Sequence, residues 1–454
     1  MIRTTFNRLR ELMSSAAAQG AGIAFGARAG GAAAALLFHV LLARLTGPAG
    51  YGAYGVAMAW TKVLAVLAGL GLPEAIVRFV PEYRERGEWG LLRGLVKGSQ
   101  WTVFGMSLII GGLGLLGLWG WTRGGEGIFF WDASSLVRAL AVGLCFLPLM
   151  SLLRLSKELC RSVDRIAAAY VLPRLGRPAF MIAALLCYST WASSSLSGSE
   201  AVALMGASIL PVWLLQLRSF YGASSVHTIS ATSEVEWGPG RWWRVAGPLL
   251  LVSGFHMAIR QTDLVVVGLL LDTEAAGTYK AALTLARPAG FVLTAVNAVA
   301  APRFSQVYAS DTPSTLRPLV ARIAHWLFWP TLLLTIGIGG LGPTLLSVFG
   351  SGFADGYIPL IVLLGSHVVN AGTGSVGYLL NMTGHHTDTA RVHAIAAVAN
   401  VGFSVVGAWT AGLVGAALAT TASTLLWNAW LHAIVRRRLG VAPSIVSTLR
   451  SRYL

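Results

Sequence analysis

The sequence contains long stretches with almost no charge, and these stretches limit the folds that the chain can adopt. Residues 96–120 and 397–435 each hold an apolar run that exceeds the roughly 20 residues needed to cross a bilayer. Inside hydrocarbon, only α-helices and closed β-barrels satisfy the hydrogen bonds of the backbone. The apolar residues are continuous rather than alternating, which favours helices. The sequence therefore predicts an all-α polytopic membrane protein.

The composition leaves little material for a water-exposed domain. Charged residues make up 11% of the 454, and the mean hydropathy is +0.67, whereas soluble domains carry roughly 25% charged residues. The net charge of +16 could indicate a nucleic-acid partner. The basic residues lie in short segments between apolar runs, where membrane topology is the usual cause. We therefore expect membrane lipids as partners and no nucleic acid.

The apolar runs predict about twelve spanning helices and no cleavable signal peptide. Residues 1–19 are polar and basic and lack the apolar core of a signal peptide, so the first span is expected to direct membrane insertion. The spans are predicted at 20–45, 53–79, 97–121, 134–155, 166–188, 201–221, 247–271, 278–302, 322–348, 357–381, 392–410 and 413–435.

The distribution of Lys and Arg predicts the orientation of the chain. If the N-terminus is cytoplasmic, the segments on that side hold 26 of the 34 basic residues, including six from Arg154 to Arg177, and the opposite side holds three. Cytoplasmic loops are enriched in Lys and Arg. We therefore expect both termini to be cytoplasmic.

The two halves of the chain resemble each other at an offset of 225 residues. Gly52 and Tyr54 align with Gly277 and Tyr279, and Arg78-Phe79 with Tyr83 aligns with Arg303-Phe304 and Tyr308. Such an internal duplication predicts two six-helix bundles related by a pseudo-two-fold axis along the membrane normal, with a cavity between them, as in transporters. The predicted parts are the bundle 1–222, a cytoplasmic linker 223–246, the bundle 247–435 and a basic cytoplasmic tail 436–454.

We take five ionisable residues inside predicted spans as candidates, because such residues are costly there and mark binding sites or pathways. They are Arg28, Lys62, Arg260, Asp263 and Arg287. Lys62 and Arg287 are themselves 225 apart, so we expect them to face each other across a central cavity. Four cations against one carboxylate favour an anionic cargo such as a phosphate or diphosphate.

Helical spacing adds two histidines to the candidate substrate site. His256, Arg260 and Asp263 recur at i, i+4 and i+7, so they share one face of a helix. Arg28 and His39 are eleven residues apart, about three turns, and also share a face.

Two bland interpretations remain open for these polar residues. Arg260 and Asp263 could neutralise each other while Arg28 extends to the headgroups, which leaves Lys62 and Arg287 unexplained. A second cluster, His385, His386, Asp388 and His393, could hold a metal ion but is better interpreted as a solvated loop. Cys145, Cys160 and Cys187 have no metal-ligand spacing. We expect no metal and no cofactor.

Three segments resemble those of a known family. Residues 41–54 (LLARLTGPAGYGAY) resemble the opening motif of bacterial polysaccharide and O-antigen flippases, which belong to the multidrug/oligosaccharidyl-lipid/polysaccharide exporter superfamily. Residues 412–420 (GLVGAALAT) are similar to the final hairpin of that family. The segment Asn381-x-Thr383-Gly384, after the tenth predicted span, also resembles that family. The resemblance covers nearly the whole chain.

The resemblance implies a flippase rather than an enzyme. It implies transfer of an undecaprenyl-diphosphate-linked oligosaccharide from the cytoplasmic to the outer leaflet of the bacterial inner membrane by alternating access. Polysaccharide polymerases and glycosyltransferases of the same pathway are the implied partners. Cations in helices 1, 2 and 8 line the cavity of related lipid II flippases, and Arg28, Lys62 and Arg287 lie in those helices here.

Two alternatives are less favoured. A multidrug or cation antiporter of the same superfamily would depend on acidic residues. Here Asp263 is the one clear intramembrane acid, with Glu74 near the end of a predicted span. A membrane-embedded polysaccharide polymerase or glycosyltransferase usually needs a sizeable outer loop or a carboxylate there. The largest predicted outer loops, 122–133 and 190–200, are short.

Overall fold

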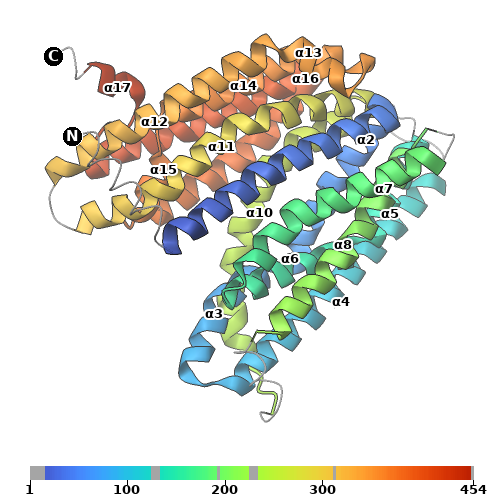
Figure 1. Cartoon of the computed structure of the whole chain (residues 1–454), viewed down its shortest axis with the longest axis horizontal. Helices are drawn as coiled ribbons and strands as arrows, with labels where there is room; N and C mark the ends of the chain where they lie inside the picture. The colour runs from blue at the N-terminus through green and yellow to red at the C-terminus, as the bar shows by residue number, and fades with distance from the viewer. Residues whose placement is uncertain (1–15, 124–132, 192–194, 224–233, 310–312, 451–454) are drawn as a thin grey trace.

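The computed structural model describes residues 16–123, 133–191, 195–223, 234–309 and 313–450. Within these ranges every regular element is helical and no strand occurs. The helices form two elongated lobes that meet at one end and diverge toward the other (Figure 1). The predicted all-α membrane fold with two bundles is confirmed.

The first lobe is built mainly from the first half of the chain. Its elements are α2 (Ala16–Gly69), α3 (Leu72–Arg86), α4 (Trp89–Arg123), α5 (Ala133–Cys145), α6 (Leu147–Ser162), the π-helix η1 (Ala167–Gly176), α7 (Arg177–Trp191) and α8 (Gly198–Tyr221).

The second half supplies the other lobe. Its elements are α10 (Pro239–Leu270), α11 (Thr273–Ala309), α12 (Pro313–Gly340), α13 (Gly342–Phe349), the 3₁₀ helix η2 (Ser351–Gly356), α14 (Tyr357–Gly372), α15 (Val376–Met382), α16 (His386–Leu439) and α17 (Ile445–Arg450).

Twelve spans result once the kinks are counted. Nine helices in the described ranges are long and apolar enough to cross a membrane, and the pair α5 and α6, bent by 48°, supplies a tenth. Two of the nine, α2 and α16, each consist of two helices joined at a kink, at Gly47 and at Ala411-Gly412. Gly47 has φ 66° and Gly412 has φ 56°, a conformation that glycine adopts at little cost. Pro48 can then occupy the first turn of the next helix, where its missing N–H is not needed.

The second predicted span, 53–79, is not continuous. It breaks between α2 and α3, where Leu70 and Gly71 both have positive φ. A Cβ at Gly71 would overlap the carbonyl oxygen of Ala246 in α10. Close approach of another backbone therefore requires glycine here, and the hydropathy of the segment does not reveal this contact.

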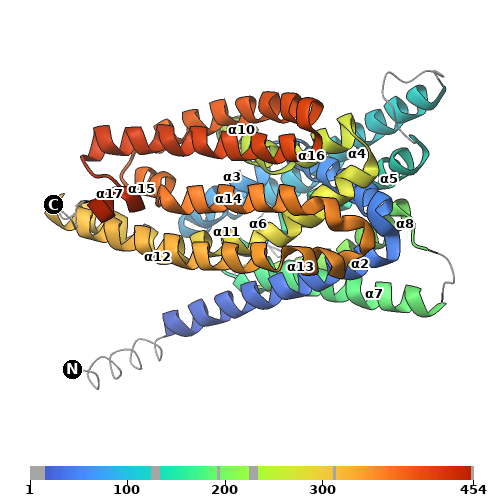
Figure 2. The ribbon, with the colours of Figure 1, turned by 90° about the horizontal axis from the view of Figure 1, so that it is seen from above.

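The beginning of α2 and the short helix α17 lie at the same end of the molecule (Figure 2), as an even number of spans requires. Large apolar side chains are exposed on both lobes, among them Trp101, Leu113, Val398 and Trp409. A surface of this kind is stable against lipid rather than water. The chain is a multi-pass membrane protein.

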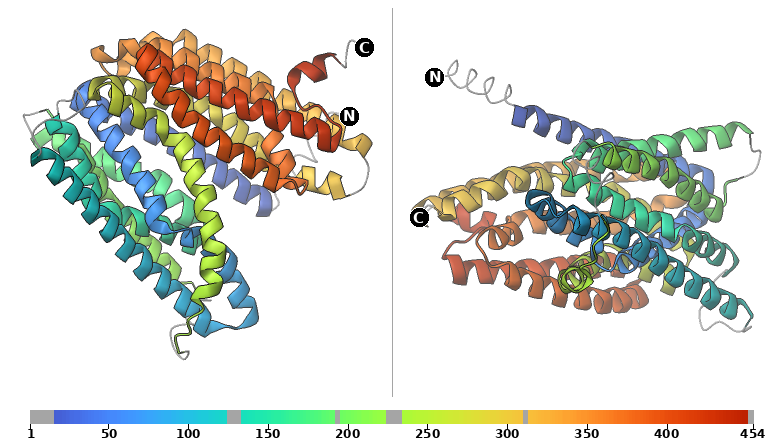
Figure 3. Two further views of the ribbon diagram at one scale, coloured as in Figure 1. Left: turned by 180° about the vertical axis from the view of Figure 1, so that it is seen from behind. Right: turned by 90° about the horizontal axis from the view of Figure 1, so that it is seen from below.

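Helix α10 connects the lobes (Figure 3). It begins at Pro239, inside the segment predicted as a linker. Its first turns pack against α3, where Trp242 Nε1 donates a hydrogen bond to Tyr83 Oη at 2.9 Å and Arg241 forms an ion pair with Glu82. That hydrogen-bonded ion pair lowers the pKa of Glu82 below its usual range. The start of α10 therefore belongs to the packing of the first lobe.

Candidate functional site

The two lobes make their closest contact between α2 and α11, a region that we call the seam. A Cβ at Gly52 would overlap the carbonyl oxygen of Thr273 and lie 2.6 Å from the amide nitrogen of Gly277. A Cβ at Gly277 would overlap the carbonyl oxygen of Pro48. Gly52 and Gly277, and likewise Pro48 and Thr273, are 225 residues apart. The contact is therefore reciprocal, as expected for two duplicated units that face each other.

Four cationic side chains gather beside the seam. Lys62 of α2 interacts electrostatically with Arg287 of α11 and with Arg177 of α7. Lys280 of α11 interacts with Lys62 and Arg287. Lys62 and Arg177 are half-buried, whereas Arg287 is exposed. In the ranges that the structure describes, none of the four forms an ion pair with a carboxylate.

Lys280 is the most enclosed of the four, with 3% of its surface exposed. Its Nζ lies 5.6 Å from the ring centroid of Tyr51 and 5.5 Å from that of Tyr54. Ring faces attract cations, by about 2 kcal/mol where both groups are desolvated. Gly55 leaves space for the aliphatic stem, because a Cβ there would lie 2.5 Å from Lys280 Cδ. Two rings from the first half thus hold a cation from the second half.

His39 continues this polar group toward the first helix. Its Nδ1 lies 3.1 Å from Tyr51 Oη, which in turn lies 3.5 Å from Thr284 Oγ1. His39 also lies within electrostatic range of Lys280, Arg287 and Lys62. The buried hydroxyl of Tyr51 therefore links His39 to α11.

The buried acid of this region, Asp263, is satisfied by neutral donors. It accepts hydrogen bonds from the amide of Leu264 at 2.8 Å, Tyr279 Oη at 3.3 Å and Thr420 Oγ1 at 3.4 Å. Both Asp263 and Arg260 lie in the described part of the chain, yet no ion pair joins them. The mutual neutralisation considered above is therefore not the arrangement found.

The predicted site residues separate into groups. Lys62 and Arg287 lie near each other, as the repeat predicted, and His39 lies near both. The helical spacing grouped His39 with Arg28 instead. Arg260 and His256 are exposed on α10, and the His256 ring lies 5.7 Å from that of His393, outside the cation group. The side chain of Arg28 lies outside the residues whose surroundings the structure describes. Substrate binding by all of them stays a prediction.

A family model described as polysaccharide biosynthesis protein matches residues 17–308, which is more than half of the chain. The chain belongs to the polysaccharide biosynthesis protein family. Among curated proteins, no sequence matches this family member.

Solved structures share the fold of this polysaccharide biosynthesis protein. The inward-facing conformation of a multidrug resistance MATE family transporter of the MOP superfamily superposes with a TM-score of 0.70 at 13% identity, covering 90% of this chain and 94% of that one. The lipid II flippase MurJ, in an inward closed conformation, superposes with a TM-score of 0.68 at 16% identity, covering 92% of this chain and 87% of that one. A MOP superfamily transporter from Pyrococcus furiosus superposes with a TM-score of 0.57 at 14% identity, covering 92% of this chain and 93% of that one. The protein thus has the fold of MOP superfamily transporters.

Two residues of the site escaped the sequence analysis. Lys280 lies inside the predicted span 278–302 and could have been found as a further intramembrane cation. Arg177 was counted with the cytoplasmic cations, although it lies within the predicted span 166–188. Its guanidinium interacts with Tyr54 and donates to Met205 Sδ at 3.4 Å, while its Nε is buried without a partner. A scan of every cation within the predicted spans would have found both residues.

Proposed function

We propose that this member of the polysaccharide biosynthesis family is a flippase. It moves an undecaprenyl-diphosphate-linked oligosaccharide from the cytoplasmic to the outer leaflet of the inner membrane, with both termini cytoplasmic. The observation that carries the proposal is the group of Lys62, Lys280, Arg287 and Arg177, four cations beside the seam with no carboxylate paired to them in the described residues. The family assignment supports the biosynthetic setting.

Electrostatics explains why such a group suits a diphosphate. Two unit charges 4 Å apart interact by about 4 kcal/mol at an effective dielectric constant of 20. Like charges gathered without a counterion therefore repel one another, and an entering diphosphate replaces this repulsion with attraction. A cationic drug would instead add to the repulsion. The charge pattern thus favours an anionic cargo over the cationic cargo of the rival antiporter.

The distribution of the cations over two lobes suits alternating access. Lys62 and Arg177 belong to the first half of the chain, whereas Lys280 and Arg287 belong to the second half. An anion held by both pairs bridges the lobes while they are in this arrangement. Rocking of the lobes about the seam would change the distance between the pairs. Such a change weakens the hold on the diphosphate and allows its release.

Transport by single variants tests this proposal. Lys62→Ala and Arg287→Ala should each abolish transport, because each removes a charge from the anion site. Lys62→Arg should retain much of the activity, since a phosphate can be held by either cation. The measurement is complementation of a flippase-null cell, together with the amount of lipid-linked intermediate that accumulates on the cytoplasmic leaflet. Membrane abundance of each variant is measured alongside.

Arg123→Ala is the matched control, because this arginine lies at the end of α4, where its guanidinium stacks 4.2 Å from the Trp119 ring centroid. It should transport normally. If Lys62→Ala and Arg287→Ala also transport normally at normal abundance, the anionic-cargo mechanism is wrong. If depletion of the protein instead sensitises cells to cationic drugs without accumulation of a lipid-linked intermediate, the antiporter alternative is correct.

A further inference from the structure

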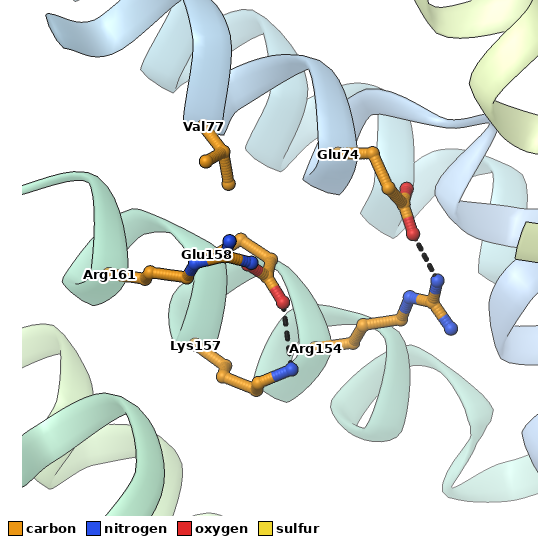
Figure 4. A pocket seen from close by; sticks show the side chains of 6 residues that line it. All are labelled: Glu74, Val77, Arg154, Lys157, Glu158 and Arg161. Carbon is orange, nitrogen blue, oxygen red and sulfur yellow. Dashed lines mark hydrogen bonds and ion pairs between the residues drawn. The ribbon is translucent and has the colours of Figure 1, made fainter. Parts of the chain in front are cut away.

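A hollow of about 430 Å³ lies between α3 and α6, in the first lobe (Figure 4). Glu74 and Val77 of α3 form one wall. The opposite wall is one face of α6, which carries three cations at i, i+3 and i+7 together with one acid: Arg154, Lys157, Glu158 and Arg161.

Carboxylates that line the hollow hold its cations in place. Arg154 forms an ion pair with Glu74 across the hollow. Glu158 is paired both with Lys157 Nζ at 2.7 Å and with Arg161 at 3.1 Å. The side chains of Lys157 and Arg161 remain 36% and 46% exposed. An anion that enters can therefore reach these cations without unfolding any element.

A second hollow, of about 520 Å³, adjoins the first and shares Glu74 and Val77 with it. It adds two exposed arginines, Arg78 of α3 and Arg244 of α10, neither of which forms an ion pair in the described part of the chain. Its remaining lining is apolar and consists of Val245, Pro248 and Leu249. Together the two hollows, which we call the paired hollow, present five cations and two carboxylates, a net formal charge of +3.

The second half of the chain lacks most of this charge at the corresponding place, although Arg303 is equivalent to Arg78. Its broken span, α14 and α15, corresponds to α5 and α6, but α15 contains no charged residue. At the offset of 225, Glu74 and Val77 align with Val299 and Pro302. The same fold therefore forms without these ion pairs in the second lobe. The charges on this face of α6 are therefore not a requirement of the fold.

We propose that the paired hollow binds the phosphate group of a lipid-borne phosphate ester. Arg154, Lys157 and Arg161 contact the phosphate oxygens by charge-assisted hydrogen bonds, and Arg78 and Arg244 add attraction from the adjoining hollow. The hydrocarbon part of the ligand packs against Val245, Pro248 and Leu249. An amphiphile with an anionic head matches this combination of a cationic wall and an apolar wall.

Two ligands share this chemistry. One is the diphosphate of the lipid-linked cargo, in which case the hollow is a loading station and rests on the proposed function. The other is the headgroup of an anionic phospholipid of the surrounding membrane. The test below separates these sources.

The chain contains four lysines, Lys62, Lys97, Lys157 and Lys280, so lysine acetylation reports on each place separately. The full chain is placed in phosphatidylcholine nanodiscs and treated with an acetylating reagent, with and without inorganic pyrophosphate. Mass spectrometry gives the labelling rate of each lysine. At a pyrophosphate concentration about ten times the dissociation constant, the site is free in roughly a tenth of the molecules. Labelling of Lys157 should therefore slow about tenfold. Exposed Lys97 should be labelled at an unchanged rate.

Charge variants give effects of opposite sign. Arg154→Gln with Arg161→Gln should raise the half-protecting pyrophosphate concentration at Lys157 at least about tenfold, because charge-assisted hydrogen bonds are lost. Glu158→Gln should lower that concentration, because it removes a competing carboxylate. Arg303→Gln, at the position equivalent to Arg78 in the second half, should change nothing. If the ion pairs are purely structural, pyrophosphate should not protect Lys157 from acetylation, and Glu158→Gln should not strengthen pyrophosphate binding.

Equal protection of Lys157 and Lys97, no protection, or weaker binding by Glu158→Gln overturns the site. The labelling rate of Lys62 tests the proposed function separately. If pyrophosphate protects Lys157 but never Lys62, the central anion site is contradicted and the paired hollow is not. The sources are separated without pyrophosphate. Slower labelling of Lys157 in nanodiscs with added phosphatidylglycerol identifies a phospholipid headgroup. Slower labelling that requires farnesyl diphosphate identifies the cargo headgroup.

Discussion

At the seam, the first half contributes Pro48 and Gly52, and the second half contributes Thr273 and Gly277 at positions 225 residues later. A few residues further on, the halves differ. Gly55 in the first half aligns with Lys280 in the second, and the small residue leaves space for the long one. Phe38 and Tyr54 are in edge-to-face contact at 6.2 Å. Their equivalents, Asp263 and Tyr279, form a hydrogen bond instead.

The comparison teaches that the glycines retained in both halves shape the contact between the lobes, whereas the buried charges Lys280 and Asp263 lie at positions that diverged. A reciprocal contact needs the same backbone clearance on both sides, so glycine occupies both positions. A buried cation needs a partner surface rather than a copy of itself, because two like charges would repel each other. Lys280 against Tyr51 and Tyr54 satisfies this requirement. The face of α6 that lines the paired hollow is likewise charged, whereas its equivalent, α15, is not.

The largest expected effect comes from breaking the symmetric part of the seam. Gly52→Val and Gly277→Val should each destabilise the protein by about 3 kcal/mol, because any Cβ at either position overlaps a backbone carbonyl of the other half. Thermal unfolding in detergent and membrane abundance measure this loss. Gly254→Val, at a position on α10 with no atom within 4 Å of a built Cβ, is the control. Unequal losses at Gly52 and Gly277 would contradict a reciprocal contact.

An effect of intermediate size is expected at the asymmetric cation. Lys280→Met should abolish transport while raising the free energy of unfolding by about 1–2 kcal/mol, because replacing a buried charge by an apolar side chain of similar volume is often stabilising. Complementation in cells measures transport, and thermal unfolding of the same variant after purification measures stability. Loss of transport together with loss of stability would mean that Lys280 is structural and does not serve the cargo.

The smallest expected difference separates the two duplicated tyrosines. Tyr279→Phe should cost about 1–2 kcal/mol, since it removes a donor from the buried carboxylate of Asp263. Tyr54→Phe should change stability by less than about 0.5 kcal/mol, because in the described residues the Tyr54 hydroxyl has no hydrogen bond and a phenyl ring still faces Lys280. Equal losses in both variants would show that the hydrogen bond to Asp263 does not distinguish the halves.

Much of the fold was predictable because every helix that crosses the bilayer needs an apolar segment long enough to span it. Apolar length located the twelve spans, and the two kinked helices fell at the predicted hairpins, next to Gly47 and Gly412. The offset of 225 also predicted that Lys62 and Arg287 lie near each other. By contrast, the polar stripe His256, Arg260 and Asp263 on α10 was predicted to act as one group. Asp263 is 3% exposed and faces Tyr279 and Thr420, whereas Arg260 is exposed.

The sequence by itself therefore determined which segments cross the membrane, that they form two related bundles, and which cations lie at equivalent positions. These properties depend on local hydropathy and on a repeat that can be read along the chain. The tertiary structure decided which face of α10 is buried, how Lys280 is enclosed between Tyr51 and Tyr54, and where α3 and α6 leave the paired hollow. Such features depend on how helices rotate and pack against distant helices. No local pattern encodes them, because the partner of each face lies far away along the chain.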